Sequence, residues 1–185
     1  MFLDSLVILG QAFSITLPIL ISGLFFIASM KLGWLTFLNK PIDIGLTLGK
    51  APLFGPNKNW RGAFLYIFGG TLVTVLLHLA QPSQPWISVV FSYDPYLLGL
   101  LACSAYVLGE LINSFIKRRL RIAPGSQGNL IQRFFDNTDG ALAMGIVLIF
   151  GYGMQLSLLL ISFAISLVIH ASTDVLMRRL ELKSK

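Results

Sequence analysis

The chain has little charge. Of its 185 residues, 12% are Asp, Glu, Lys or Arg and 55% are hydrophobic, and the mean hydropathy is +0.78. A soluble domain carries about 25% charged residues. So few charges cannot cover a water-exposed surface, which excludes a soluble globular protein and predicts an integral membrane protein.

Cysteine and histidine are scarce as well. The single cysteine, Cys103, excludes an intrachain disulfide and lies inside an apolar run. The sequence contains no zinc-ligand spacing and no Cys-His or Ser-His-Asp pattern. These absences argue against a zinc protein and against a hydrolase that uses an activated Ser or Cys nucleophile.

Long apolar runs are abundant. A membrane-spanning helix requires about 20 mostly apolar residues. Five segments reach this length, at about 6–30, 62–79, 96–115, 129–152 and 154–176. The fourth reaches it when it begins near Asn129, which places Asp136 and Asp139 in its first turns. We therefore expect an all-α integral membrane protein of five transmembrane helices, with residues 1–185 forming a single transmembrane domain.

Basic residues are absent from the N-terminus and from the connections at 81–95 and 151–153. The 14 Lys and Arg residues lie between the first two spans, around the loop between spans three and four, or after span five. Cytoplasmic loops of membrane proteins are enriched in Lys and Arg. This asymmetry predicts a cell-membrane protein with its N-terminus outside, its C-terminus in the cytoplasm and two functional cytoplasmic loops.

The first of these loops ends in a compact run, KAPLFGPNKNWRG, just before the second span. Asn57, Lys58 and Arg61 follow the turn signal Gly55-Pro56. Backbone N–H groups at a helix N-terminus, together with Lys and Arg, bind anions such as phosphate. The alternative is ordinary anchoring, in which juxtamembrane basic residues contact lipid headgroups.

The second loop combines basic residues with turn residues. Lys117 and Arg118 precede Pro124, Gly125 and Asn129, and the glycines of this loop allow close approach of the backbone to a ligand. This composition predicts a second phosphate-binding segment. Two further basic residues of the loop, Arg119 and Arg121, also suit a contact with anionic lipids.

Asp136 and Asp139 are the sharpest chemical signal in the chain. Residues at i and i+3 share one face of a helix, and carboxylates within a membrane span usually mark function. Two adjacent carboxylates repel unless a cation lies between them, and Mg²⁺ is often held by one or two carboxylates plus substrate phosphates. We expect both to bind Mg²⁺; the alternative is that they cap the fourth span.

Glu110, His170 and Asp174 are further polar side chains within the spans. Glu110 suits either the metal site or neutralisation of a basic residue, because carboxylates in membranes usually pair. His170 and Asp174 stand at i and i+4 in the fifth span, where a structural hydrogen bond is favoured over catalysis.

These motifs resemble the lipid cytidylyltransferases, in which Ser and Lys-Arg precede a Pro-Gly loop and a D-x-x-D pair opens a helix. The matching positions here are Ser114, Lys117, Arg118, Pro124, Gly125, Asp136 and Asp139. The sequence departs from the bacterial and eukaryotic pattern at Gly-Ser-Gln-Gly-Asn, which replaces a His-Gly-Gly run, and at Asp-Asn-Thr-Asp. The short five-span form resembles the archaeal branch, the CDP-archaeol synthase family.

The resemblance implies cytidylyl transfer from CTP to 2,3-bis-O-(geranylgeranyl)-sn-glycerol 1-phosphate, an isoprenoid ether-lipid phosphate, with Mg²⁺ as cofactor. It implies that Asp136 and Asp139 hold the metal, that four basic residues clamp phosphates and that Asn57 and the second loop contact the nucleotide. The four basic residues are Lys58, Arg61, Lys117 and Arg118. The expected partners are CTP, the lipid phosphate and membrane lipids, with no nucleic acid and no obligate protein partner.

Three other functions compete with this interpretation. Asp139-Gly140 resembles the opening of the CDP-alcohol phosphotransferase motif, but no further acidic residue follows before Asp174. An acyl-phosphate glycerol acyltransferase has a similar size, yet it does not require the aspartate pair. A small transporter could use Glu110, Asp136 and Asp139 along a polar route, although no inverted repeat is visible in the sequence.

Overall fold

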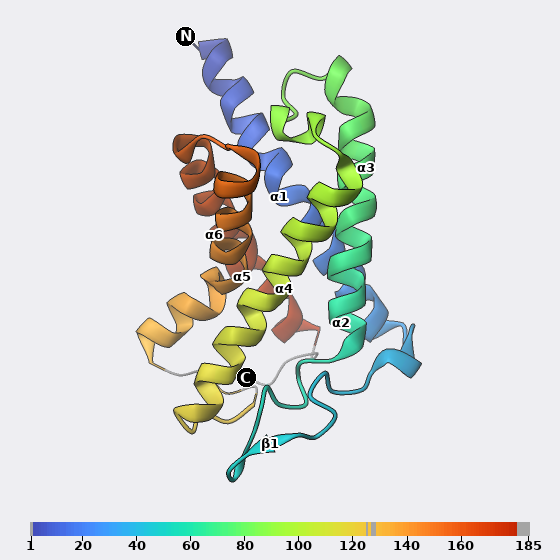
Figure 1. The fold of residues 1–185 in the computed structure, drawn as a ribbon, viewed down its shortest axis with the longest axis vertical. Coiled ribbons are helices and arrows are strands. Elements are labelled where there is room, and N and C mark those ends of the chain that lie inside the picture. The colour runs from blue at the N-terminus through green and yellow to red at the C-terminus, as the bar shows by residue number, and fades with distance from the viewer. Residues whose placement is uncertain (1, 125, 127–128, 181–185) are drawn as a thin grey trace.

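Each of the five apolar runs forms a helix in the computed structural model, which describes residues 2–124, 126 and 129–180 (Figure 1). Within these ranges, the side chains of residues 2, 3, 130, 174 and 178 are not described. The long helices are α1 (Phe2–Lys31), α4 (Pro95–Arg119), α5 (Leu130–Tyr152), α6 (Leu156–Arg179) and the continuous run of α2 (Trp60–Phe64), η2 (Leu65–Gly69) and α3 (Gly70–Ala80). The described residues thus contain five helices long and apolar enough to cross a membrane, which confirms the expected fold class.

The helix starts follow local capping chemistry. Asn59, Asp94 and Asn129 stand immediately before α2, α4 and α5, and each side-chain oxygen accepts a hydrogen bond from a backbone N–H in the first turn. Because Asn129 caps α5, Asp136 and Asp139 lie one to three turns inside the helix. The alternative that these aspartates cap the fourth span is therefore wrong.

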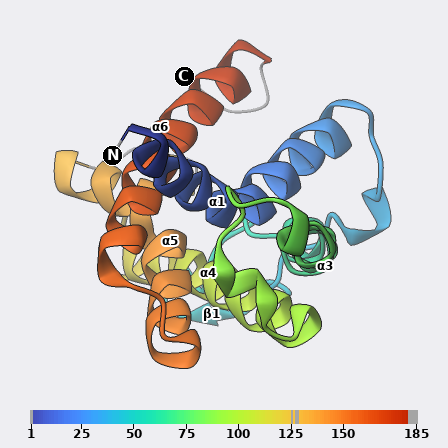
Figure 2. The ribbon, with the colours of Figure 1, turned by 90° about the horizontal axis from the view of Figure 1, so that it is seen from above.

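Helix α1 lies between α3 and α6 and contacts both, while α4 packs against α3 and α5 (Figure 2). The run from α2 to α3 contains one π-helical stretch, η2. Such a bulge rotates the residues on either side relative to one another. Tyr66 of η2 thereby stacks on Tyr106 of α4, with 5.3 Å between ring centroids, and approaches Phe26 of α1.

One end of the bundle is closed by the connection from α3 to α4, which includes η3 (Gln81–Ser83) and η4 (Val89–Ser92). Three apolar residues of this connection, Ile87, Val90 and Phe91, are buried against the helices, and the Ser88 backbone N–H donates to Ser14 Oγ at 3.0 Å. The connection thus packs onto the helices, and we call this end the capped end.

The opposite end, here the basic end, carries loop 1 (residues 32–59) and loop 2 (residues 120–129), and both lie together in Figure 1. Loop 1 contains η1 (Thr36–Leu38) and a hairpin of two short antiparallel strands, β1 (Thr47–Leu48) and β2 (Ala51–Pro52). The guanidinium of Arg119, at the end of α4, donates to the carbonyls of Leu48 and Pro52. The hairpin is therefore fastened to the helix from which loop 2 departs.

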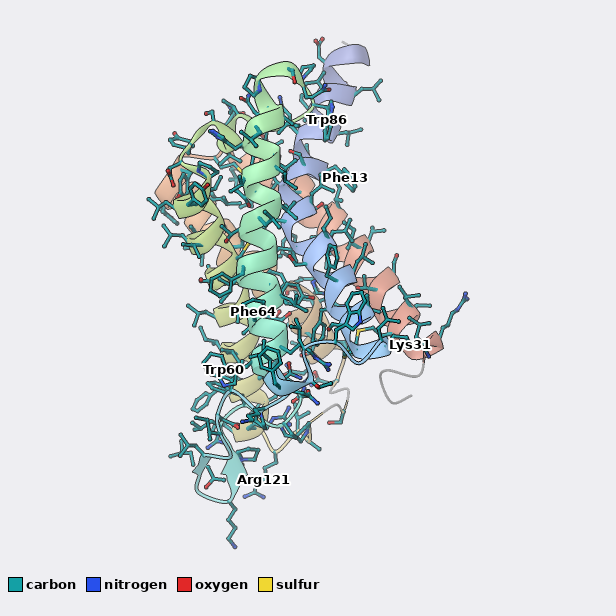
Figure 3. The ribbon with its side chains drawn as sticks, turned by 90° about the vertical axis from the view of Figure 1, so that its right-hand side faces the viewer. Phe13, Lys31, Trp60, Phe64, Trp86 and Arg121 are labelled. Carbon is teal, nitrogen blue, oxygen red and sulfur yellow. The ribbon has the colours of Figure 1, made fainter. Side chains whose placement is uncertain are left out.

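Many large apolar side chains point outward between the two ends, as expected for helices in lipid. Figure 3 shows Phe13 and Phe64 on this surface, with Trp86 at the capped end and Trp60 and Lys31 towards the basic end. Tryptophan is enriched where membrane meets water. The tryptophans and the apolar surface between them mark the band that lies in the membrane.

Candidate active site

The site is built where α4 and α5 face each other near the basic end. Helix α4 presents Glu110, Asn113 and Lys117 at spacings of three and four residues, so these side chains share one face. Helix α5 presents Asp136 and Asp139 on its own facing side. The site therefore consists of two short polar stripes on otherwise apolar helices.

Two glycines allow these helices to approach closely. A Cβ atom added at Gly109 would lie 2.4 Å from the carbonyl oxygen of Asp139, and one at Gly140 would lie 2.6 Å from the ring of Tyr106. Neither position has room for a side chain without a shift of the neighbouring helix. The glycines set the distance at which the polar stripes meet.

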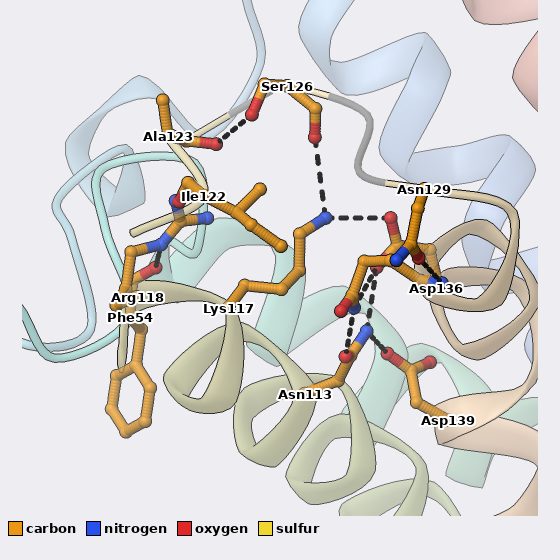
Figure 4. Close-up of polar contacts among 11 residues, drawn as sticks. Phe54, Asn113, Lys117, Arg118, Ile122, Ala123, Ser126, Asn129, Asp136 and Asp139 are labelled. Atoms are coloured by element: carbon orange, nitrogen blue, oxygen red, sulfur yellow. Dashed lines mark hydrogen bonds and ion pairs between the residues drawn. The ribbon is translucent and has the colours of Figure 1, made fainter. Parts of the chain in front are cut away.

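The two aspartates converge on one amide group. Asn113 Nδ2 donates to Asp136 Oδ1 at 2.8 Å and to Asp139 Oδ2 at 2.7 Å (Figure 4). The Asn113 Oδ1 atom accepts from Gln132 Nε2 at 2.8 Å, which determines which way the amide faces. The carboxylates of adjacent turns are thus held towards a common point.

Lys117 lies beside the two aspartates, on the side nearer the basic end. Lys117 Nζ lies 2.7 Å from Asp136 Oδ2 and 3.5 Å from the backbone carbonyl of Ser126 in loop 2 (Figure 4). Lys117 is buried and lines the cavity described below. This ammonium, expected to clamp phosphate, lies directly beside the carboxylates.

Arg118 joins the two loops. Its Nε atom donates to the Phe54 carbonyl of loop 1 at 3.0 Å, and its Nη1 atom donates to the Ile122 carbonyl of loop 2 (Figure 4). Gly55, with a φ of +100°, packs beside both Arg118 and Pro124, so only a residue without a Cβ fits there. Arg118 lines the cavity while it holds the loops together.

Loop 1 is organised by a carboxylate that the sequence analysis did not single out. Asp43 is 4% exposed, and its side chain accepts hydrogen bonds from the backbone N–H groups of Gly45, Phe54 and Gly55. Burial acts to raise the pKa of this carboxyl, but the three backbone donors outweigh it and the pKa lies below its ordinary value. Asp43 fixes the turn that leads to Asn57 and Lys58.

Lys58 reaches from loop 1 into the bundle. Its Nζ atom lies 2.5 Å from Glu110 Oε2, and the two side chains are 22% and 23% exposed. Burial acts to lower the pKa of the ammonium, whereas the negative charge of Glu110 and its hydrogen bond raise the pKa above its ordinary value. Of the two roles considered for Glu110, the structure places it in the neutralisation of a basic residue.

Arg61, expected to clamp phosphate, takes a different position. It is 7% exposed, and its guanidinium faces the carbonyls of Ser29 and Trp34 at the end of α1 and the ring of Phe26. Cations near a helix C-terminus are stabilised by its exposed carbonyls. Arg61 does not line the cavity formed by the described residues.

Some expected contacts cannot be placed. Gly125 and the side chain of Asp174 lie outside the described part of the chain. His170, expected to pair with Asp174, lies with its Nε2 atom 2.7 Å from the Tyr106 hydroxyl. Gln132 received no role from the sequence, although its spacing of four residues from Asp136 is the signal that could have found it.

A cavity of about 510 Å³ joins these groups. Near the basic end it is lined by polar side chains, namely Asn57, Lys58, Glu110, Asn113, Lys117, Arg118, Asp136 and Asp139. Deeper in the bundle it is lined by apolar side chains of α1, α5 and α6, such as Ile19, Met144 and Leu159. A cavity of this kind suits a molecule with an anionic head and an apolar tail.

The donor set of the carboxylate pair fits Mg²⁺. Because one amide nitrogen contacts an oxygen of each aspartate, the two carboxylates lie close enough together for one cation beside Asn113 to meet both. Within the described ranges, no group of three or more His, Cys, Asp or Glu side chains is placed to hold a metal. Mg²⁺ binds through one or two carboxylates when substrate phosphates and water complete its shell, so Asp136 and Asp139 suffice.

Comparisons with protein families, with individual proteins and with solved structures all find similarity to archaeal enzymes of membrane-lipid synthesis. A family model for CarS-like CDP-archaeol synthases matches residues 15–185. The CDP-archaeol synthase of Pyrococcus furiosus is 41% identical over 86 residues, a match that spans about half of each protein, 46% of this chain and 48% of the relative. That of Hyperthermus butylicus is 29% identical over 150 residues, covering 80% of this chain and 82% of the relative.

A solved structure described as an intramembrane enzyme for archaeal membrane lipids biosynthesis shares the fold, with a TM-score of 0.61, 20% identity and 95% coverage of both chains. The family match extends over both loops and both polar stripes, which are the parts that build the cavity. On this evidence the chain belongs to the CarS-like CDP-archaeol synthase family.

Proposed function

We propose that this protein transfers a cytidylyl group from CTP to 2,3-bis-O-(geranylgeranyl)-sn-glycerol 1-phosphate, releasing pyrophosphate. The observation that carries the proposal is the cavity with carboxylates and ammonium groups at one end and apolar helix faces at the other. Membership of the CDP-archaeol synthase family supports the choice of CTP and of an ether-lipid phosphate.

The chemistry requires little from a general base. A phosphate monoester has a second pKa near 6, so at pH 7 the lipid phosphate is mostly ionised and is itself the nucleophile. One of its oxygens attacks the α-phosphorus of CTP, and the bond from the α-phosphorus to the bridging oxygen breaks as pyrophosphate leaves. Catalysis then depends on alignment of two anions and on neutralisation of their charge.

The residues of the cavity suit these tasks. Asp136 and Asp139 would hold Mg²⁺, which when bound neutralises the triphosphate and stabilises the leaving pyrophosphate. Lys117 stands beside Asp136 and Arg118 lines the same cavity, so both can contact phosphate oxygens there. Asn57 lines the same cavity and can donate to the nucleotide. Pro124 and Asn129 are proposed for nucleotide contacts from the family resemblance alone, because neither lines the cavity: Pro124 packs beside Gly55, and Asn129 caps α5.

The orientation follows from charge. All described Lys and Arg residues lie towards the basic end, and such residues favour the cytoplasmic side of a membrane. We infer that the basic end faces the cytoplasm of the cell, where CTP is present, and that the N-terminus is outside. Because the connection from α3 to α4 covers the capped end, we infer that substrates reach the cavity from the basic end or from the membrane.

The test uses protein purified in detergent with labelled CTP, Mg²⁺ and a panel of acceptors: the ether-lipid phosphate, an ester-linked phosphatidate and the dephosphorylated ether lipid. We expect CDP-lipid and pyrophosphate in equal amounts from a lipid phosphate, and no product from the dephosphorylated lipid. Absence of CDP-lipid with every lipid phosphate would contradict the proposal. Release of CMP from a supplied CDP-lipid and an alcohol would indicate a phosphotransferase instead.

A further inference from the structure

Two lysines pair with carboxylates that line the cavity, Lys117 with Asp136 and Lys58 with Glu110. Helix α4 runs from the capped end to the basic end, and Glu110 precedes Lys117 by seven residues, or about 10 Å along the helix axis. Lys117 pairs with Asp136 near the basic end, and Lys58 pairs with Glu110 on the deeper side. The two ammonium groups therefore face the cavity at different depths.

Lys58 is held at both ends. Its backbone N–H donates to Gly55 O at 3.1 Å, and its carbonyl accepts from the Ile42 N–H at 2.9 Å, within the turn that Asp43 fixes. The tip of the side chain is held by Glu110. A lysine of a loop normally keeps its ammonium in water, so the position of Glu110 accounts for the inward course of this side chain.

The ammonium of Lys58 lies at the boundary between the two parts of the cavity. Next to Glu110, one helical turn further from the basic end, Tyr106 stacks on Tyr66 and contacts His170, and all three side chains line the cavity. The apolar lining of Ile19, Met144 and Leu159 belongs to the same cavity. A lipid whose chains occupy the apolar part would bring its phosphate to Lys58 first.

We propose that Lys58 contacts the phosphate of the lipid substrate and that Glu110 is the positioning residue that holds Lys58 there. Lys117 and Arg118 then serve the nucleotide phosphates from the basic end. This assignment rests on the proposed function and divides the basic residues between the two substrates.

The division is chemically consistent. An ammonium group has three N–H donors, so Lys58 can keep its bond to Glu110 and still donate to phosphate oxygens. Glu110 alone would repel a phosphate, and Lys58 alone would be a costly charge at this depth. The ion pair removes both penalties and leaves a donor directed into the cavity.

The test measures the KM for each substrate separately in the purified full-length protein. We expect Lys58→Met and Glu110→Gln to raise the KM for the lipid phosphate at least about tenfold, the effect of losing a charge-assisted hydrogen bond. Their KM for CTP should stay within about twofold of wild type. Lys117→Met should raise the KM for CTP and leave the KM for the lipid phosphate nearly unchanged. Glu110→Asp should recover part of the affinity for the lipid phosphate that Glu110→Gln loses. Lys50→Met is the control and should change neither KM, because Lys50 is exposed in the turn of the β-hairpin.

CTP binding without lipid gives a second readout, measured by calorimetry. Lys58→Met and Glu110→Gln should bind CTP as wild type does, whereas a weakened CTP affinity in either variant would overturn the assignment. An equal rise of both KM values would overturn it too. If Glu110→Gln does not fold, the charge-retaining Glu110→Asp and the Lys58→Met variant decide the question. Failure of the wild-type protein to form CDP-lipid would contradict the proposed function, not this division of roles.

Discussion

At the scale of single residues, the centre of the site is an amide placed between two carboxylates. Asn113 contacts both Asp136 and Asp139, and Gln132 fixes the orientation of that amide. Such a partner orients the groups that would bind a metal and is nearly as important as the ligands themselves. Replacement of an aspartate and replacement of Asn113 are therefore expected to have different effects.

We expect Asp136→Asn and Asp139→Asn to lower turnover at least about 100-fold, because loss of a partner that merely orients a ligand already costs 10–100-fold. Each asparagine keeps the size of the side chain, so the fold should persist. The measurement is turnover together with the rise in unfolding temperature that Mg²⁺ and CTP produce in wild type. A variant that keeps full activity, or the full rise, would contradict the metal assignment.

Asn113→Leu tests the orienting role. Leucine has the same branched shape but offers no donor, so the carboxylates repel one another without the amide between them. We expect affinity for Mg²⁺ to fall about 10–100-fold, measured as the Mg²⁺ dependence of turnover. The matched control is Gln155→Leu, which removes an exposed amide at the capped end and should behave as wild type.

At the scale of elements, the site depends on the contact between α4 and α5. Gly109 and Gly140 lie where each helix meets the other, and neither has space for a Cβ atom. Gly151, on the same α5 helix, would place a Cβ 3.9 Å from Val147, which is ordinary contact.

We therefore expect Gly109→Ala and Gly140→Ala to lower both the unfolding temperature and turnover, since overpacking costs about 1–3 kcal/mol and separates the polar stripes. Gly151→Ala is the control and should have no such effect. Equal behaviour of all three variants in thermal unfolding and turnover would show that close helix approach does not set the site.

Loop 1 depends on Asp43 in the same way. Asp43→Asn replaces a charged acceptor of three backbone N–H groups, and we expect a loss of about 2 kcal/mol or more of stability at pH 7. Asp94→Asn is the control, because Asn caps a helix about as well as Asp.

The effect of Asp43 has a defined pH dependence. Because the folded pKa of Asp43 is lowered, its contribution is fully present above the ordinary Asp pKa of about 3.9 and is lost as pH falls through the folded value. The difference in unfolding temperature between wild type and Asp43→Asn should therefore shrink below about pH 4. A difference that persists at lower pH would contradict the role of the carboxylate.

At the scale of the whole molecule, hydropathy and charge were enough to predict five spans and their connections, because membrane helices require long apolar runs. The start of α5, which Asn129 caps, was predicted from the same length requirement. The sequence did not predict the position of Arg61 at the end of α1, since a juxtamembrane arginine can satisfy either phosphate or helix carbonyls. Asp43 was missed because its partners are backbone groups, which no local motif reveals. Gln132 was missed although it stands four residues before Asp136, because its main partner, the amide of Asn113, lies on another helix.

The orientation in the membrane can be measured with the same chain. Its single cysteine, Cys103, is buried, so Lys50→Cys at the basic end and Ser83→Cys at the capped end each introduce one accessible thiol. A membrane-impermeant maleimide added to intact cells should label Ser83→Cys and leave Lys50→Cys unlabelled until the cells are opened. The opposite pattern would place the basic end outside.

In the proposed reaction, a single cavity brings CTP and a lipid phosphate together at Asp136 and Asp139. The most direct measurement is the formation of CDP-lipid from labelled CTP by purified wild-type protein and by Asp139→Asn, with Mg²⁺ present and the product identified by mass. We predict CDP-lipid from the wild type and at least about 100-fold less from the folded variant. The same rate of CDP-lipid formation in both proteins, or none in the wild type, would contradict this account.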